Sequence, residues 1–202
     1  MGKESEHRDM ARAVWTRGVF PHQFSWLIDN PFRRLILSPE TLVKRLPLSV
    51  SSRVLEIGPG SGYFSRALAA RVPEGRLELF DLQPEMLAKA ERKLRADGYQ
   101  NIGYTIGNAG ENLPFPDGYF DVACLVSVLG EISDQERCLR ELHRVLGSSG
   151  VLAFHESIPD PDLILFGALQ GLVEPLGFKF QRRWGRPRNY TATFVKFESN
   201  LY

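Results

Sequence analysis

The stretch that decides the fold reads VLEIGPGSGYF and runs from Val54 to Phe64. Its first four residues are a short apolar run typical of a β-strand, and this run stops at Gly58. Helical periodicity begins at Gly62 and continues to Val72. Glycines between a strand and a helix permit a tight turn and let a ligand approach the backbone closely. The unpaired N–H groups at the start of the helix favour an anionic group. The stretch therefore predicts a ligand-binding turn.

An acidic residue follows the next predicted strand, residues 77–80. Asp81 stands nineteen positions after Gly62, where a carboxylate can accept hydrogen bonds from ribose hydroxyls. The loop departs from the dinucleotide fingerprint G-x-G-x-x-G, because Tyr63 occupies the position of the third glycine. Glu56, two residues before the first glycine, is unfavourable beside a pyrophosphate and favourable beside a cationic ligand. An NAD-dependent oxidoreductase is disfavoured by this spacing and stays open as an alternative.

Strands and helices alternate along the chain from residue 53 onward. This alternation predicts βαβ units around a mostly parallel sheet, with right-handed crossovers in a doubly wound α/β layer structure. Residues 120–127 are almost continuously apolar, as expected of a strand covered on both faces. Ser133 and Glu136 have the spacing of a capping box and predict a helix start. Further strands are expected at 102–106, 151–155, 178–181 and 191–197, and further helices at 84–97, 133–146 and 163–176.

Composition excludes several classes of protein. The chain has 202 residues, of which 43% are hydrophobic and 11% aromatic, so it can bury a sizeable core. Its net charge of +1 provides no overall attraction to nucleic acid or membrane. Two cysteines, Cys124 and Cys138, lie in apolar segments that predict burial, and neither a disulfide framework nor a metal site is expected. The charged residues 1–12 and the absence of a long apolar run predict a cytoplasmic protein without a membrane span.

The first fifty residues do not join the alternation. We expect residues 1–50 to form a helical appendage, broken by glycine and proline, and residues 51–202 to form one compact unit. Phe20, Phe24 and Trp26 cluster in the appendage, either as an apolar lid over a substrate or as simple packing against the sheet.

The chain resembles the class I S-adenosylmethionine-dependent methyltransferases in four linked motifs. The first is the glycine loop preceded by Glu56, and the second is FDL at 80–82 with PEML at 84–87. The others are GNA at 107–109 with LPFPD at 113–117 and FDV at 120–122, and then LREL, RVL and GVL between 139 and 152. The resemblance covers residues 53–157. Within the family, the chain is similar to the small-molecule methyltransferases of ubiquinone and menaquinone biosynthesis. It implies a three-layer Rossmann-like fold, with a mostly parallel seven-stranded sheet and an antiparallel last strand.

The resemblance also implies a cofactor, S-adenosylmethionine, which leaves as S-adenosylhomocysteine. In the family the acid at the position of Glu56 lies near the methionine amino group, and the loop glycines line the methionyl part. Asp81 would bind the ribose, and Ser127 would offer its carbonyl. The family commonly has aspartate where this chain has Asn108, whose carbonyl oxygen can equally accept a hydrogen bond from the adenine amino group. The expected cofactor residues are Glu56, Gly58, Gly60, Gly62, Asp81, Leu82, Asn108, Ala109 and Ser127.

The resemblance implies methyl transfer to a small, apolar or amphipathic acceptor. The sulfonium already activates the methyl group, so the protein mainly positions and desolvates the reactants. A general base is needed only for an acceptor that is protonated at working pH. His155 at the end of the fifth strand, Glu131 and His22 are candidates for this role, although a structural histidine is the simpler interpretation of His155. Residues 126–131 lack the Asn/Asp-Pro-Pro-aromatic motif of amino-methylating DNA enzymes, which disfavours a nucleic-acid acceptor.

A basic segment near the C-terminus stays open in function. Residues 179–188 contain five basic side chains with interleaved aromatics. Such a segment can contact phosphates, RNA or an anionic membrane face, or it can be a solvated strand end. A non-catalytic module that binds S-adenosylmethionine, or no cofactor, and holds a partner through this segment is therefore a second alternative. The sequence does not determine the oligomeric state.

Overall fold

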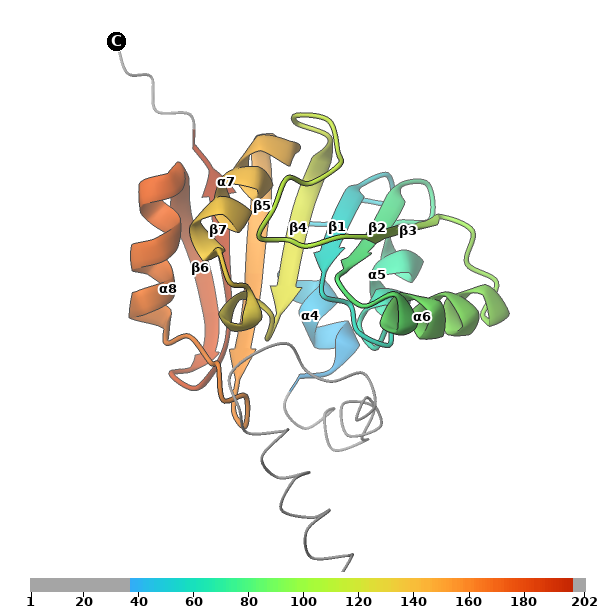
Figure 1. Cartoon of the computed structure of the whole chain (residues 1–202), viewed down its shortest axis with the longest axis horizontal. Helices are drawn as coiled ribbons and strands as arrows, with labels where there is room; N and C mark the ends of the chain where they lie inside the picture. The colour runs from blue at the N-terminus through green and yellow to red at the C-terminus, as the bar shows by residue number, and fades with distance from the viewer. Residues whose placement is uncertain (1–36, 198–202) are drawn as a thin grey trace, which may run out of the picture.

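The computed structural model describes residues 37–197. Seven strands form one sheet in the order β3-β2-β1-β4-β5-β7-β6 (Figure 1). β7 pairs antiparallel with both of its neighbours, and the other paired strands run parallel. The predicted fold class is thus confirmed. The strands are β1 (Arg53–Ile57), β2 (Arg76–Asp81), β3 (Ile102–Ile106), β4 (Phe120–Val126), β5 (Leu146–Ser157), β6 (Phe178–Arg186) and β7 (Asn189–Lys196).

Helices cover both faces of the sheet because its strands alternate their apolar side chains between the two faces. On one face, Leu55 and Ile57 of β1 pack with buried residues of α7 and α8. On the other face, Val54 packs with buried residues of α4, α5 and α6. The helices are α4 (Pro39–Arg45), α5 (Ser65–Arg71), α6 (Pro84–Ala96), α7 (Gln135–Val145) and α8 (Phe166–Val173), with 3-10 turns η2 (Leu129–Glu131) and η3 (Glu174–Leu176).

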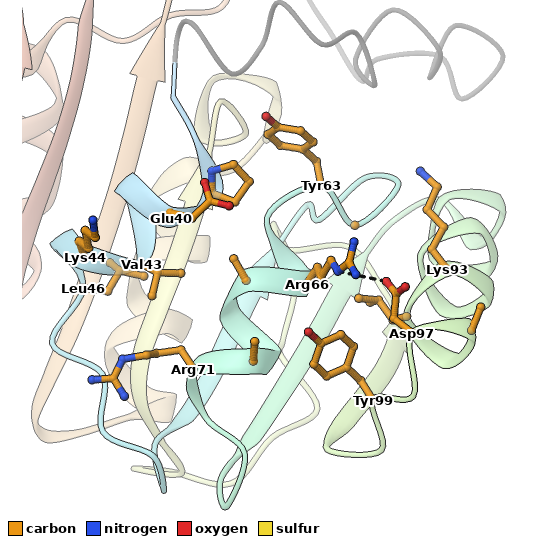
Figure 2. A pocket seen from close by; sticks show the side chains of 16 residues that line it. Glu40, Val43, Lys44, Leu46, Tyr63, Arg66, Arg71, Lys93, Asp97 and Tyr99 are labelled. Carbon is orange, nitrogen blue, oxygen red and sulfur yellow. Dashed lines mark ion pairs between the residues drawn. The ribbon is translucent and has the colours of Figure 1, made fainter.

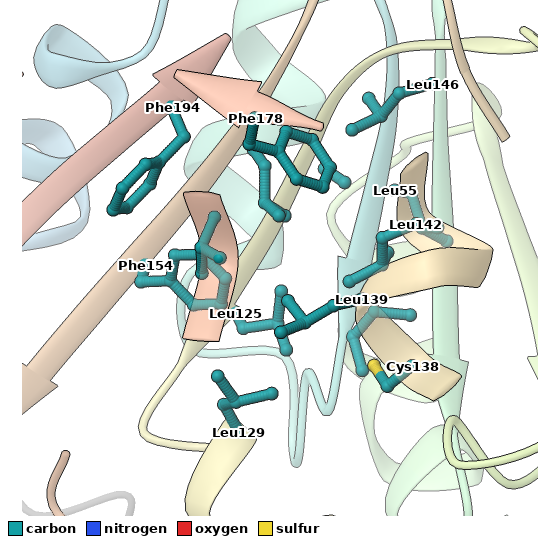
Figure 3. Packing of buried hydrophobic residues seen from close by; sticks show 14 of the residues in the cluster. Leu55, Leu125, Leu129, Cys138, Leu139, Leu142, Leu146, Phe154, Phe178 and Phe194 are labelled. Atoms are coloured by element: carbon teal, nitrogen blue, oxygen red, sulfur yellow. The ribbon is translucent and has the colours of Figure 1, made fainter. Parts of the chain in front are cut away.

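The core on the α7 face is built from leucine and phenylalanine. Leu139 and Leu142 of α7 lie over Leu125 of β4, and Phe154 and Phe194 pack beside them (Figure 3). Their periodic spacing in the sequence predicts this buried stripe. Both cysteines are buried and free, as expected. Burial raises the pKa of Cys138 to about 12, so this thiol stays protonated at neutral pH.

The structure corrects several expected boundaries. The N-cap of α7 is Asp134, whose carboxylate accepts a hydrogen bond from the Arg137 amide at 3.0 Å, so the predicted capping box at Ser133 is wrong by one residue. The predicted helix at 163–176 begins only at Phe166, after the segment 158–165, which connects β5 to α8. β5 begins at Leu146 instead of residue 151, because Leu146 already pairs with Phe120.

The described part of the predicted appendage packs into the core. Ser38 caps α4 by accepting from the Thr41 amide at 3.1 Å, and Leu42 and Leu46 are buried with residues of β1 and β2. The predicted lid residues Phe20, Phe24 and Trp26, with His22, lie outside the described residues. Within residues 37–197, no helix combines the length and the apolar character needed to cross a bilayer.

Candidate functional site

A cavity of about 230 Å³ lies where the strand order reverses, at the carboxyl ends of β1, β2 and β4. Ligands of open α/β sheets bind at such a switch point, because the loops on either side of it diverge. Seven of the nine residues expected to contact the cofactor line this cavity. These are Gly58, Gly60, Asp81, Leu82, Asn108, Ala109 and Ser127.

The glycine loop forms one wall of the cavity, and its conformation requires glycine. Gly58 and Gly60 have φ values of 64° and 57°, a region that side chains other than glycine rarely occupy. A Cβ atom at Gly58 would lie 2.5 Å from Cγ2 of Val128, in the loop after β4. The Gly58 amide donates to the carbonyl oxygen of Phe80 at 2.8 Å. Only glycine therefore allows the loop to pass between β2 and the residues that follow β4.

Asp81 ends β2 beside this loop and is only 8% exposed. Its Oδ2 accepts a hydrogen bond from the Gly60 amide at 3.2 Å, and its Oδ1 accepts one from the Gln83 amide at 2.9 Å. Burial raises the pKa of the Asp81 carboxyl, and these backbone hydrogen bonds oppose that rise. The result is an oriented, partly desolvated acceptor that lines the cavity.

Asn108 occupies the loop after β3 and is oriented by that loop. Its Oδ1 accepts from the Gly110 amide at 2.9 Å, and its Nδ2 donates to Oε1 of Glu111 at 3.2 Å. The Gly107 amide donates to the Asp81 carbonyl at 3.0 Å, which joins this loop to the end of β2. The second lone pair of the Asn108 carbonyl oxygen can accept a further hydrogen bond.

Ser127 follows β4 in an unusual conformation. Among the described residues other than glycine, it alone has a positive φ, 53°. Its amide donates to the His155 carbonyl at 2.8 Å, and its hydroxyl bonds to the carboxylate of Asp160. Strained backbone of this kind persists where surrounding contacts hold it, often beside a binding site.

Two of the expected residues do not reach the cavity. Gly62 lies behind it, and a Cβ atom there would be 3.1 Å from Cβ of Ala90 in α6. Glu56 is buried on the face covered by α5, where the Ser65 hydroxyl donates to its Oε2 at 2.6 Å. Gly62 thus supports the packing of two helices, and Glu56 lies directly behind the cavity-lining residue Ile57.

The candidate bases are placed differently from one another. Glu131 of η2 lines the cavity. His155 does not line it and is 1% exposed. Its Nδ1 lies 3.1 Å from Oγ1 of Thr191, which also accepts a hydrogen bond from Nη1 of Arg45 at 2.7 Å. This network favours the structural interpretation of His155.

Further residues that line the cavity were not among the expected cofactor residues or candidate bases. The segment after β4 contributes three of them to the cavity wall: Val128, Ile132 and Ser133. The apolar side chains in this segment are the sequence feature that could have predicted its place at the site. Glu156, next to His155 at the end of β5, does not line the cavity; it is 1% exposed, and its Oε2 accepts from the Ile164 amide at 3.1 Å. Burial raises the pKa of Glu156 to about 8.

A second, larger hollow of about 1210 Å³ lies between α4, α5 and α6, away from the strand ends (Figure 2). Gly62 is the only expected cofactor residue that lines it. Its walls include Tyr63, Tyr99 and the ion pair between Arg66 and Asp97, at 3.3 Å. Most of the expected cofactor residues therefore line the smaller cavity at the strand ends and not this larger hollow.

Comparisons with known proteins agree with this geometry. A family model described as "Methyltransferase domain" matches residues 55–154. The ubiquinone/menaquinone biosynthesis C-methyltransferase UbiE of Vibrio campbellii is 39% identical over 114 residues, which cover 54% of this chain and 44% of that protein. The demethylmenaquinone methyltransferase of Geobacillus kaustophilus is 34% identical over 121 residues, which cover 59% of this chain and 51% of that protein. The chain thus spans about half the length of these curated relatives.

The fold also matches a solved structure over most of the chain. A SAM-dependent methyltransferase from Aquifex aeolicus has a TM-score of 0.81 and 22% identity, with 89% of this chain and 100% of that chain covered. The family match decides against the NAD-dependent oxidoreductase that the glycine loop left open. The chain belongs to the class I S-adenosylmethionine-dependent methyltransferases, a family whose cofactor is S-adenosylmethionine.

Proposed function

We propose that this chain transfers a methyl group from S-adenosylmethionine to a small, apolar or amphipathic acceptor. The observation that carries the proposal is the strand-end cavity, where the glycine loop, Asp81 and Asn108 meet an apolar wall that includes Val128 and Ile132. The relatives named as ubiquinone/menaquinone biosynthesis C-methyltransferase and demethylmenaquinone methyltransferase support an acceptor of this class.

The residues of the cavity suit an adenosyl cofactor. The Asp81 carboxylate can accept hydrogen bonds from two ribose hydroxyls, and the Asn108 carbonyl oxygen can accept one from the adenine amino group. Gly58 and Gly60 leave the backbone bare where the methionyl part would pass, and Ser127 would turn its carbonyl toward it. Glu56, behind Ile57, provides a negative charge for the methionine ammonium group, through the backbone or water.

The bound cofactor supplies an activated methyl group on a positively charged sulfur. The protein then has to hold the acceptor in line with that group and keep water out, and orientation of this kind can lower a barrier by up to about 10 kcal/mol. Val128 and Ile132 provide an apolar wall that would exclude water from the reactants. For an acceptor that must lose a proton, Glu131 is the candidate base that lines the cavity, whereas His155 is held by Thr191 outside it.

The segment 158–165 contacts the loop after β4, which includes the cavity-lining residue Ser127. Asp160 is bonded to the Ser127 hydroxyl, and the backbone of Asp162 lies so close to Gly130 that a Cβ atom on that glycine would collide with it. Two aliphatic side chains of this segment are exposed: Ile158 by 55% and Leu165 by 51%. Exposed aliphatic side chains on this segment suit an acceptor with a lipophilic part.

Calorimetric titration with S-adenosylhomocysteine tests the cofactor site. We expect binding by the unmutated chain and a loss of at least about tenfold in affinity for Asp81→Ala. Asp121→Ala is the matched control, because Asp121 also accepts a backbone hydrogen bond, from Arg53 at 2.7 Å, but does not line the cavity. Absence of binding by the unmutated chain would overturn the proposal. Transfer of labelled methyl to quinol-like acceptors then tests the substrate class.

The predicted lid belongs to the same proposal. If Phe20, Phe24 and Trp26 cover an apolar acceptor, replacing all three by alanine lowers methyl transfer and leaves binding of S-adenosylhomocysteine unchanged. His22→Gln, measured in the same assay across pH, tests the remaining candidate base. Equal methyl transfer by the triple variant would show that these residues serve packing alone.

A further inference from the structure

The turn between β6 and β7 lies at the same edge of the sheet as the candidate site. β7 runs antiparallel to β5, so the turn of this hairpin meets the carboxyl end of β5 (Figure 1). The Arg188 carbonyl oxygen accepts a hydrogen bond from the Ile158 amide at 3.0 Å. The hairpin is thereby joined to the segment 158–165, which is bonded through Asp160 to the cavity-lining residue Ser127.

Four arginines crowd this hairpin without counterions. Arg182, Arg183, Arg186 and Arg188 are all exposed, and within residues 37–197 no carboxylate forms an ion pair with any of them. No acidic residue occurs between positions 177 and 197. Several arginines elsewhere in the structure form ion pairs, as in Arg140 with Glu136 at 2.7 Å. The hairpin therefore presents a concentrated positive charge, and its own strands contain no acidic residue to neutralise it.

Apolar side chains border the arginines. The Arg183 guanidinium lies 4.7 Å from the centre of the Phe166 ring, and Leu165, the preceding residue, is exposed. Ile158 is exposed beside the hairpin turn, to which its amide is bonded. Trp184 is half-buried beneath Arg182, whose guanidinium lies 5.3 Å from the centre of its ring. Positive charge and aliphatic surface thus adjoin one another at this end of the sheet, on both sides of the edge strand β6.

Two nearby carboxylates, Asp160 and Glu156, are engaged by other groups. Asp160 accepts from the Asp162 amide at 2.9 Å and from the Ser127 hydroxyl. Glu156 is buried below the segment and bonded to the Ile164 amide. Neither of these two carboxylates forms an ion pair with the four arginines, whose charges give the hairpin a positive potential.

We propose that this region docks onto the surface of an anionic lipid bilayer. We call it the basic face, formed by Arg182, Arg183, Trp184, Arg186, Arg188, Ile158 and Leu165. Arginines next to an anionic membrane each contribute favourable free energy, and exposed aliphatic side chains add to it by entering the interface. RNA would use the charge but has no use for Ile158 and Leu165, and Arg182 already covers the ring on which a base would stack. Docking of this kind does not depend on methyl transfer.

Vesicle flotation of the full chain tests the proposal. We expect binding to phosphatidylcholine vesicles that contain phosphatidylglycerol, and little binding to phosphatidylcholine alone. Arg186→Gln with Arg188→Gln lowers the partition coefficient about 30-fold, the effect expected when two cations leave an anionic surface. Arg71→Gln with Arg92→Gln removes the same charge from exposed positions in α5 and α6 and leaves the partition nearly unchanged.

A second pair of variants tests the apolar part. Ile158→Ser with Leu165→Ser keeps the charge and weakens the binding that persists at high salt, where screening has removed most of the electrostatic attraction. Equal losses in the hairpin and control variants, or equal binding to both kinds of vesicle, would overturn the proposal. Competition by single-stranded RNA that depends on the same arginines would assign the face to nucleic acid instead. Titration of every variant with S-adenosylhomocysteine keeps this test separate from that of the methyltransferase site.

Discussion

The carboxylate of Asp81 accepts a hydrogen bond from the backbone amide of Gly60 at 3.2 Å, across 21 positions of sequence. The other oxygen accepts from the Gln83 amide at 2.9 Å, just before α6. One side chain therefore joins the glycine loop after β1 to the turn after β2. The group proposed to bind the ribose also shapes the loop before any ligand arrives.

Cofactor binding is expected to depend on the ionisation of Asp81. Burial raises the pKa of this carboxyl, so protonation begins at a higher pH than for an ordinary aspartate. Because the ionised form accepts more hydrogen bonds, the affinity for S-adenosylhomocysteine falls as the pH is lowered from about 7 to about 4.5. Asp81→Asn binds at least about tenfold more weakly at neutral pH and lacks most of this dependence. Titration calorimetry of both proteins across this pH range checks the prediction. Parallel pH profiles of affinity for the unmutated chain and Asp81→Asn would contradict it.

Gly58→Ala should be far more costly than an ordinary substitution at positive φ. The new Cβ atom would lie 2.5 Å from Cγ2 of Val128, whereas a Cβ atom at Gly98, with φ of 86°, meets nothing within 4 Å. We expect Gly98→Ala to lower the free energy of unfolding by about 1 kcal/mol and Gly58→Ala by about 3 kcal/mol. Adding Val128→Ala to Gly58→Ala should recover part of the difference. Urea denaturation of the unmutated chain and the three variants measures these differences. Equal losses of unfolding free energy in Gly58→Ala and Gly98→Ala would refute the steric explanation.

Gly62→Ala should separate stability from ligand binding. Gly62 has a φ of 82°, and its Cβ position lies 3.1 Å from Cβ of Ala90, but it does not line the strand-end cavity. The variant should lose about 1–2 kcal/mol of unfolding free energy. Its affinity for S-adenosylhomocysteine, measured well below the unfolding temperature, should stay within about twofold of the unmutated chain. A tenfold loss of affinity with little loss of stability would instead assign Gly62 a direct role at the ligand.

Glu156 should make the chain less stable as the pH rises. Burial raises its pKa to about 8, from an ordinary value of 4.5. Between these values the folded chain holds a proton that the unfolded chain has lost, so the free energy of unfolding falls with rising pH across this window and levels off above it. Glu156→Gln keeps an oxygen for the Ile164 amide and removes the titration.

We therefore expect Glu156→Gln to match the unmutated chain near pH 5 and to exceed its unfolding free energy near pH 8.5, by at most about 5 kcal/mol. Urea denaturation at both pH values provides the comparison, and the difference between the two proteins cancels the titration of other groups. Parallel loss of stability in both proteins would show that Glu156 ionises normally.

Patterns that act over a few residues were reliable guides to the fold. The apolar run at 120–127 predicts a strand covered on both faces, and β4 lies at the centre of the sheet. The glycine loop predicts a strand followed by a turn and a helix, although α5 begins only at Ser65, because the turn uses the residues before it. The wrong cap at Ser133 arose because Asp134 offers an equally good acceptor one position later.

The sequence by itself determined the order of the elements, the parallel sheet and the turn that marks the family, because periodicity, glycine spacing and chain polarity are local properties. Only the tertiary structure decided which expected residues face the cavity. Glu56 lies behind the cavity because strand alternation turns it toward Ser65. His155 lies outside the cavity because its ring is held by Thr191, which is 36 positions away in the sequence. Thr191 is in turn bonded to Arg45, which is 146 positions from it. These contacts follow from the pairing of β5 with β7, and no local pattern encodes that pairing.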